Sequence, residues 1–168
     1  MIELKQAIAD VPDFPRPGIL FRDISPLLRN HFDATLKALD ALLTEKEWDS
    51  IDALAGIESR GFILGAALAA RRGKGFVLVR KQGKLPPPVV DVAFKLEYGS
   101  GILEMQRGAG RLVLIDDVLA TGGTMSAAAG LCERAGYELH ALAALIDLNM
   151  VRNYAWRTLR LRAVLNYP

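Results

Sequence analysis

The chain has 168 residues, a formal net charge of +2 and a hydrophobic fraction of 51%. This length fits one domain with a full core, and the nearly balanced charge gives no reason to expect a nucleic-acid or membrane partner. Cys132 is the single cysteine, the first residues lack a signal-peptide pattern and no apolar run could span a bilayer, so we expect a cytoplasmic protein without disulfides.

The first thirty residues combine a short helical pattern with a proline-rich apolar arm. Residues 2–9 have the spacing of a short amphipathic helix. Residues 11–26 contain four prolines, which forbid a regular helix, yet they are rich in Phe, Ile and Leu. An apolar segment without regular structure either packs on the core or covers a ligand, and the residues alone leave both readings open.

A helix and a first strand–loop–helix unit come next. Apolar residues at helical spacing predict an amphipathic core helix from residue 32 to about Lys46. Residues 51–55 predict a strand, and residues 62–70 a helix. The loop between them places Arg60, which suits bidentate phosphate binding, just before the helix start. Glu58 and Arg60 could equally form an ordinary surface ion pair.

The next predicted element is a strand over residues 75–79, and it is followed by a cluster of cations and then by a glycine-rich segment. The cations around Gly83 are typical of a solvated turn. They also follow the carboxyl end of a buried strand, where open α/β sheets bind ligands. Residues 89–105 form short alternating segments on either side of a glycine-rich centre, which indicates a hairpin or a mobile flap.

The stretch from residue 112 to residue 124 is the most informative part of the chain. Residues 112–115 are all apolar and β-forming, as in a strand buried on both faces. Asp116 and Asp117 follow at once, before a turn that contains Gly122 and Gly123. A helix is expected to begin at Met125 and to end at Gly136.

This order of strand, acidic pair, glycine turn and helix suits a ligand that has both a phosphate and a diol. Backbone N–H groups at a helix start hold a phosphate, and Gly122 and Gly123 allow the backbone to approach it closely. Ionised Asp116 and Asp117 can accept hydrogen bonds from vicinal hydroxyls. A ribose 5-phosphate fits both halves. The glycine spacing matches neither a P-loop nor a dinucleotide fold, which disfavours a nicotinamide-dependent oxidoreductase.

Two more apolar strands are expected at residues 139–146 and 159–165. The alternation of strands and helices predicts an α/β fold, with a mainly parallel twisted sheet and helices on both faces. The site should lie at the carboxyl ends of the strands.

Several of these segments resemble known proteins. Residues 112–124 resemble the phosphoribosyl-pyrophosphate motif of type I phosphoribosyltransferases. Residues 14–24 resemble the signature of the adenine phosphoribosyltransferase family, and residues 96–99 its flexible catalytic loop. Residues 148–152 depart from the family pattern, which has a Gly-Arg pair there. The resemblance implies one type I domain over residues 1–168, with an N-terminal hood for the base at about 1–30 and a flexible β-hairpin flap at about 85–106.

The resemblance also implies a reaction, a cofactor and partners. The 5-phosphoribosyl group would pass from phosphoribosyl pyrophosphate to N9 of adenine, giving AMP and pyrophosphate, as a step of purine salvage. Mg²⁺ is the expected cofactor, with no direct side-chain ligand assigned, and Asp116 and Asp117 are candidates to hold it through water. A homodimer is implied, with no nucleic-acid or membrane partner.

The implied site residues fall into four groups. Adenine would lie against Leu20, Phe21 and Arg22, partly through their backbone groups. Pyrophosphate would meet Ser59, Arg60, Lys81 and Lys84, the two lysines reaching across from the neighbouring subunit. The ribose phosphate would be held by Asp116, Asp117, Ala120, Thr121, Gly122, Gly123 and Thr124. Glu97 would be the catalytic acid and Tyr98 would shield the site. A cis peptide bond is implied between Glu58 and Ser59.

Two alternatives remain. A phosphoribosyltransferase for another purine, such as xanthine or hypoxanthine and guanine, would share the central motif, so that the hood must discriminate. A non-catalytic regulator that senses phosphoribosyl pyrophosphate usually carries a DNA-binding domain, and 168 residues leave no room for one.

Overall fold

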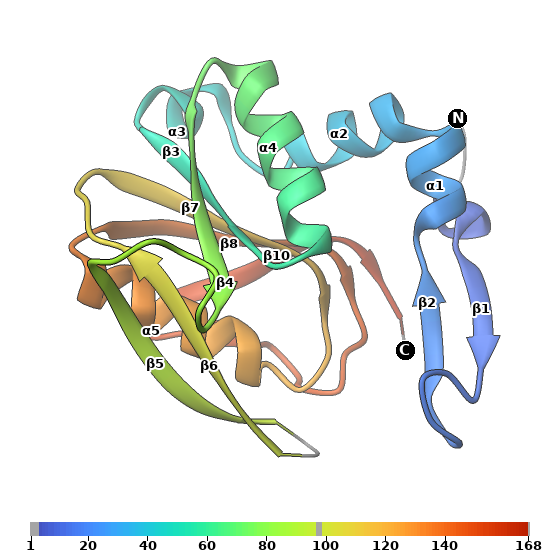
Figure 1. The fold of residues 1–168 in the computed structure, drawn as a ribbon. Coiled ribbons are helices and arrows are strands. Elements are labelled where there is room, and N and C mark those ends of the chain that lie inside the picture. Colours follow the sequence, from blue (N-terminus) through green and yellow to red (C-terminus); the bar gives the residue numbers. More distant parts are fainter. Residues whose placement is uncertain (1–3, 97–98, 168) are drawn as a thin grey trace.

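The computed structural model describes residues 4–96 and 99–167, and its centre is an eight-stranded sheet with the order β5-β6-β4-β3-β7-β8-β10-β9 (Figure 1). The strands are β3 (Ala53–Ile57), β4 (Gly75–Lys81), β5 (Val89–Leu96), β6 (Gly99–Gln106), β7 (Arg111–Leu119), β8 (Glu138–Asp147), β9 (Ala155–Trp156) and β10 (Leu159–Asn166). The five central strands, from β4 to β10, are parallel. Antiparallel pairs lie at the two edges, where β6 joins β4 and β5, and β9 joins β10. The mainly parallel sheet is therefore confirmed.

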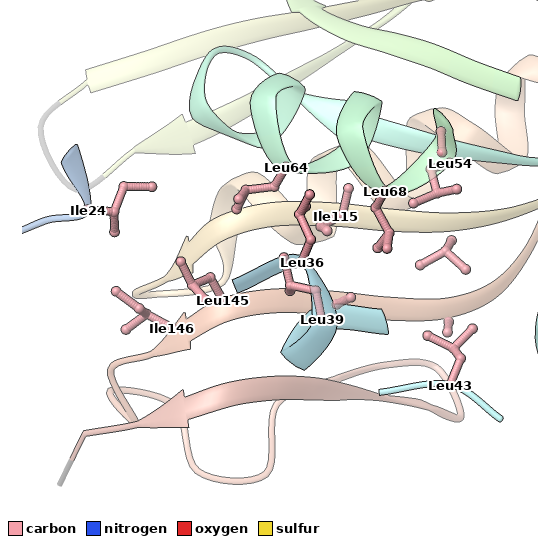
Figure 2. Packing of buried hydrophobic residues seen from close by; sticks show 14 of the residues in the cluster. Ile24, Leu36, Leu39, Leu43, Leu54, Leu64, Leu68, Ile115, Leu145 and Ile146 are labelled. Atoms are coloured by element: carbon pink, nitrogen blue, oxygen red, sulfur yellow. The ribbon is translucent and has the colours of Figure 1, made fainter. Parts of the chain in front are cut away.

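Helices cover both faces of the sheet, as predicted. α4 (Arg60–Arg72) and α2 (Phe32–Asp40) pack on one face, and α5 (Gly123–Ala135) packs on the other. Figure 2 shows Leu64 and Leu68 of α4 pointing toward Ile115 of β7. Burying each such side chain contributes roughly 1.5–3 kcal/mol. The predicted stop of α5 is confirmed, because Gly136 has a φ of 106° and caps the helix in the left-handed region. None of the helices in the described part of the chain is long and apolar enough to span a bilayer.

The central strand is longer than predicted. Residues 112–115 have no exposed surface, as expected of a strand covered on both faces. β7 nevertheless continues to Leu119, because its pairing with β8 persists through Asp116 and Val118. The expectation that Asp116 and Asp117 follow the strand was therefore wrong. Both aspartates lie in the last part of β7, so the sheet holds their backbone in place.

The proline-rich arm has regular structure after all. It follows a short 3-10 helix, η1 (Leu4–Ala7), and forms an antiparallel ribbon of β1 (Ala9–Pro12) and β2 (Leu20–Asp23), which leads into α1 (Ser25–Asn30). The expectation of an irregular arm was wrong because Pro12 ends β1, and Pro15 and Pro17 lie in the connecting loop, where they interrupt no ladder bond. The ribbon stands beside the C-terminal end of the chain, away from the large sheet (Figure 1).

The helix that was predicted to run to about Lys46 ends at Asp40, and a second helix, α3 (Glu45–Asp49), follows it. The break comes from a capping box. The N–H of Glu47 donates to Oγ1 of Thr44 at 3.3 Å, and the N–H of Thr44 donates to Oε2 of Glu47 at 2.9 Å. Trp48 of α3 is 1% exposed and packs in the core.

Candidate active site

The carboxyl ends of the central strands open into a cavity of about 590 Å³. It brings together five segments: the loop after β3, the end of β4, the β5–β6 hairpin, the acidic pair of β7 and the start of α5. Its lining consists of Ile57, Glu58, Ser59, Arg60, Lys81, Phe94, Ser100, Gly101, Ile102, Leu103, Asp116, Asp117 and Thr124. A cavity with polar and charged walls therefore lies at the carboxyl ends of the strands, where the site was predicted.

Asp117 faces this cavity beside Arg60. Its side chain is 9% exposed, and its Oδ2 lies 2.7 Å from Nε of Arg60. The Nε–H bond of Arg60 is not directed at that oxygen, so the contact is an ion pair without a hydrogen bond. No other side chain or backbone group in the described part of the chain donates to this buried Oδ2. Asp117 therefore keeps an acceptor that a ligand or a water can use.

Asp116 lies in a different environment from its neighbour. Its Oδ1 accepts the N–H of Asp117 at 2.9 Å. The residue keeps some exposed surface, yet protein surrounds it closely: a Cβ added to Gly61 would lie only 3.0 Å from Oδ1 of Asp116. Burial, and then the charge of Asp117, raise the pKa of Asp116 well above its usual value. The charge of Asp117 thus opposes the ionisation of the adjacent Asp116 carboxyl.

A second, smaller cavity of about 90 Å³ shares Asp116 and Thr124 with the first. It is lined by Asp116, Val118, Leu119, Ala120, Thr121, Gly122, Gly123, Thr124 and Met125. The N-cap of α5 is Gly122, with a φ of 80°, so that it offers no side chain to cap the helix. The first N–H bonded back into the helix is that of Ser126, which donates to the Gly122 carbonyl at 2.9 Å. The N–H groups of residues 123–125 remain available for an anion, together with the helix dipole.

The loop after β3 contains the expected cis peptide bond, between Glu58 and Ser59. Glu58 does not pair with Arg60. Its carboxylate accepts Nε of Arg80 at 3.1 Å and the N–H of Lys81 at 3.1 Å, and this fixes the end of β4 next to the loop. The reading of Glu58 and Arg60 as a surface ion pair was therefore wrong, and Arg60 is left to face the cavity.

Of the two predicted lysines, the structure brings only Lys81 into the cavity of its own chain. Lys84 is exposed and does not line it. The turn that carries Lys84 is held by Glu104, a 3% exposed residue of β6. Glu104 accepts the N–H groups of Gly83 at 3.0 Å, of Lys84 at 2.7 Å and of Leu85 at 2.7 Å. Burial alone would raise the pKa of Glu104, but the three N–H groups outweigh it and lower the pKa.

A third cavity, of about 430 Å³, lies under the β1–β2 ribbon and shares Arg60 with the first. Its lining consists of Val11, Phe14, Phe21, Asp23, Ser25 and Arg60. The rings of Phe14 and Phe21 meet edge to face, with centroids 5.1 Å apart. The Arg60 guanidinium lies 4.8 Å from the Phe21 centroid. An apolar wall with a few polar groups suits a flat heterocycle.

The neighbours of Phe21 point elsewhere, because side chains alternate along a strand. Leu20 is 47% exposed and lies outside the lining. Arg22 pairs with Asp10, and its guanidinium lies 4.2 Å from the centroid of Tyr167. Of the three residues assigned to the base, only Phe21 therefore offers its side chain to this cavity.

Glu97 and Tyr98 lie outside the described residues. The strands on either side of them reach the main cavity through Phe94 of β5 and Ser100 of β6. Sequence reasoning missed Phe94, Asp23, Ser25 and Glu104. A buried acid between Leu103 and Met105 in an apolar strand was the available signal for Glu104, since an isolated buried carboxylate needs partners.

Known proteins resemble this chain over almost its whole length. The phosphoribosyl transferase domain family matches residues 32–159. The adenine phosphoribosyltransferase of Hydrogenovibrio crunogenus is 50% identical over 165 residues, which cover 98% of this chain and 96% of the relative. That of Bdellovibrio bacteriovorus is 46% identical over 166 residues, which cover 99% and 100%.

Solved structures agree with this. The crystal structure of adenine phosphoribosyltransferase from Rhodothermus marinus matches with a TM-score of 0.86 and 44% identity, over 97% of this chain and 96% of that chain. The enzyme from Saccharomyces cerevisiae, complexed with a dideoxy-imino-altritol bisphosphate and adenine, matches with a TM-score of 0.88 and 35% identity, over 97% of each chain. This chain belongs to the adenine phosphoribosyltransferase family.

Proposed function

We propose that this protein transfers the 5-phosphoribosyl group of phosphoribosyl pyrophosphate to N9 of adenine, releasing pyrophosphate and forming AMP in purine salvage. The observation that carries the proposal is the continuity of the three cavities. Thr124 and Asp116 join the anion cradle to the carboxylate-lined cavity, and Arg60 joins that cavity to the aromatic pocket. Phosphate, sugar and base follow one another in the same order in a purine nucleotide.

The cradle at the start of α5 would hold the 5-phosphate. Residues 120–124 line it, the N–H groups of residues 123–125 point out of the helix start, and the hydroxyls of Thr121 and Thr124 add donors. Asp116 and Asp117 would accept the two ribose hydroxyls. The unpartnered Oδ2 of Asp117 supports this role, because a diol supplies the donor that this oxygen lacks.

Breaking the bond at the anomeric carbon leaves positive charge on the sugar and negative charge on pyrophosphate, as in glycoside hydrolysis. Arg60 and Lys81, both facing the main cavity, would neutralise the leaving group, and Ser59 would donate a hydrogen bond to it. Lys84 lies outside the cavity of its own chain. We therefore assign it to the pyrophosphate of a neighbouring subunit, which requires a homodimer.

The residues that face the main cavity fit Mg²⁺ bound mainly through the substrate. The described part of the chain has no cluster of three His, Cys, Asp or Glu side chains that could hold a metal alone. Two adjacent carboxylates, one with a buried oxygen that accepts no hydrogen bond, suit a hard cation whose other ligands are water and phosphate oxygens. Bound there, Mg²⁺ would supply positive charge beside the departing pyrophosphate.

The pocket under the ribbon would hold adenine. Phe21 and Phe14 give it apolar contact, and the Arg60 guanidinium lies near the same ring of Phe21. Because the side chains of Leu20 and Arg22 point away, these residues would act through backbone N–H and C=O groups, which can read the edge of the base. This assigns residues 1–30 as the hood.

Family membership supports the remaining assignments. Glu97 would act as the catalytic acid at the base, and Tyr98 would shield the cationic sugar from water, with residues 85–106 as the flap. Phe94 and Ser100, from the two strands of that hairpin, already line the cavity. A cytoplasmic setting for the reaction stays a prediction on the same ground.

The direct test measures pyrophosphate release from phosphoribosyl pyrophosphate with adenine, hypoxanthine, guanine and xanthine in turn. We expect release with adenine, and Mg²⁺ chelation should abolish it. Release with xanthine alone, or with hypoxanthine and guanine alone, would assign the protein to another purine. Tight binding of phosphoribosyl pyrophosphate without release from any base would favour the sensing role.

A further inference from the structure

Tyr154 lies against the phosphate cradle, although it comes from the loop between β8 and β9, next to the segment that departs from the family pattern. Its side chain belongs to the apolar cluster around α5, and the residue is 8% exposed. Its ring covers Gly122 so closely that a Cβ added to this glycine would lie 2.4 Å from a ring carbon. The cradle is thus backed by a residue 32 positions away in the sequence.

The hydroxyl of Tyr154 joins two groups at the start of α5. It lies 2.7 Å from Oγ of Ser126 and 3.4 Å from the carbonyl oxygen of Gly122. Tyr154 has one hydroxyl proton, so both bonds form together only in one direction: Ser126 donates to Tyr154, and Tyr154 donates to Gly122. Burial raises the pKa of Tyr154, so this proton stays in place across the physiological range.

The orientation of one peptide group follows from these bonds. In a trans peptide the C=O and the next N–H point in opposite directions. The Gly122 carbonyl points toward the N–H of Ser126 and the hydroxyl of Tyr154. The N–H of Gly123 must therefore point the other way, out of the helix start and into the cradle. Gly122 has no side chain to fix this peptide and has a φ of 80°, so its carbonyl is held by the N–H of Ser126 and by the hydroxyl of Tyr154.

We infer that Tyr154 is a positioning residue for the phosphate cradle: its hydroxyl holds the Gly122–Gly123 peptide with its N–H toward the 5-phosphate. The inference rests on the proposed function, since it assumes that an anion occupies the cradle. The inferred role belongs to the hydroxyl of Tyr154 and not to its ring, because the ring alone would only pack against Gly122. A phenylalanine would keep this packing but remove one of the two hydrogen bonds that orient the peptide, leaving only that from the N–H of Ser126.

The test replaces Tyr154 by phenylalanine and measures steady-state kinetics. Losing one hydrogen bond to the cradle should raise the KM for phosphoribosyl pyrophosphate about two- to tenfold, with the KM for adenine unchanged. The matched control is Tyr137→Phe at the opposite end of the sheet, where the hydroxyl lies against Gly108. This control should leave both KM values unchanged. A fall in Tm for Tyr154→Phe without a change in either KM would overturn the inference and leave packing as the role.

A second variant tests the hydrogen-bond chain itself. Ser126→Ala removes the donor to Tyr154, and the double variant Ser126→Ala/Tyr154→Phe should raise the same KM little more than Tyr154→Phe alone. Multiplied effects would contradict a shared chain. Calorimetric binding of AMP to each variant separates this inference from the proposed function. If the wild-type protein is inactive with adenine yet binds AMP two- to tenfold more tightly than Tyr154→Phe, only the proposed reaction fails. Equal AMP binding would overturn the inference.

Discussion

At the scale of single residues, the adjacent carboxylates of Asp116 and Asp117 have opposite roles in the stability of the free protein. Asp117 is paired with Arg60 at 2.7 Å, whereas Asp116 has no cation at this distance among the described residues. Burial and the charge of Asp117 raise the pKa of Asp116. A carboxyl whose pKa is raised on folding destabilises the folded state above the usual pKa of about 3.9, because the folded state binds its proton more tightly than the unfolded state.

Asp116→Asn should therefore raise stability and weaken binding. The amide keeps the oxygen that accepts the N–H of Asp117 and removes the repulsion, so the free energy of unfolding at pH 7 should rise by roughly 0.5–2 kcal/mol. The gain should shrink as the pH falls toward 3.9, where Asp116 of the unfolded wild type also becomes protonated. Binding of phosphoribosyl pyrophosphate should weaken about tenfold or more. Urea unfolding over a pH series and calorimetry measure the two effects.

Asp117→Asn is the matched comparison, since it makes the same chemical change at the neighbouring position. It leaves Arg60 without its partner, so we expect it to lower both stability and binding. If both variants changed stability with the same sign, the difference between the two environments would be refuted.

At the scale of elements, most of the fold could be predicted from sequence patterns, because buried parallel strands and amphipathic helices have strong local signals. The errors have local physical causes. The break after Asp40 depended on the capping box of Thr44 and Glu47, a signal that was present and overlooked. The β1–β2 ribbon is a local hairpin, and its prolines suggested irregular structure instead. The extension of β7 depends on β8, which is distant in the sequence.

The candidate site could likewise be predicted only in part. The cradle and the acidic pair lie on one continuous stretch, so their proximity could be predicted. The partners of Glu104 and Tyr154 could not be predicted, since each contacts a segment about 20 or more residues away. Alternation along β2 could have separated Phe21 from Leu20 and Arg22, had the strand been recognised.

Glu104 offers a test at this scale, because a residue of β6 fixes the turn after β4. In Glu104→Gln the amide nitrogen would replace one carboxylate oxygen, so that a buried N–H of the turn loses its acceptor. We expect a loss of about 1–3 kcal/mol of stability and a raised KM for phosphoribosyl pyrophosphate. Glu138→Gln is the control, since Glu138 is an exposed residue paired with Arg111, and it should change stability by less than about 0.5 kcal/mol. Equal effects of the two substitutions would show that the turn does not need Glu104.

At the scale of the whole molecule, the position of Lys84 bears on assembly. Lys81 lines the cavity of its own chain and Lys84 does not. Leu78 and Ile63 expose 37% and 45% of their surface on the neighbouring β4 and α4, as apolar residues at a subunit contact would. Both observations support a homodimer in which Lys84 completes the site of the partner.

Mixing two weakened variants tests this arrangement. If Lys84 acts across the interface, a heterodimer of Asp117→Asn and Lys84→Ala chains has one intact site, and random mixing should restore roughly one quarter of wild-type activity. If Lys84 acts within its own chain, both sites of the heterodimer stay defective. Activity no higher than the mean of the two parent variants would therefore contradict the proposed role. Light scattering should give a mass near twice 18.3 kDa.

The central claim is that the start of α5, the acidic pair and the pocket under the ribbon form one nucleotide site. A crystal structure with AMP tests it most directly. We predict the 5-phosphate within hydrogen-bonding distance of the N–H groups of residues 123–125, the ribose hydroxyls at Asp116 and Asp117, and the base beside Phe21. AMP bound elsewhere, or a cradle still empty at a saturating concentration of AMP, would contradict the account.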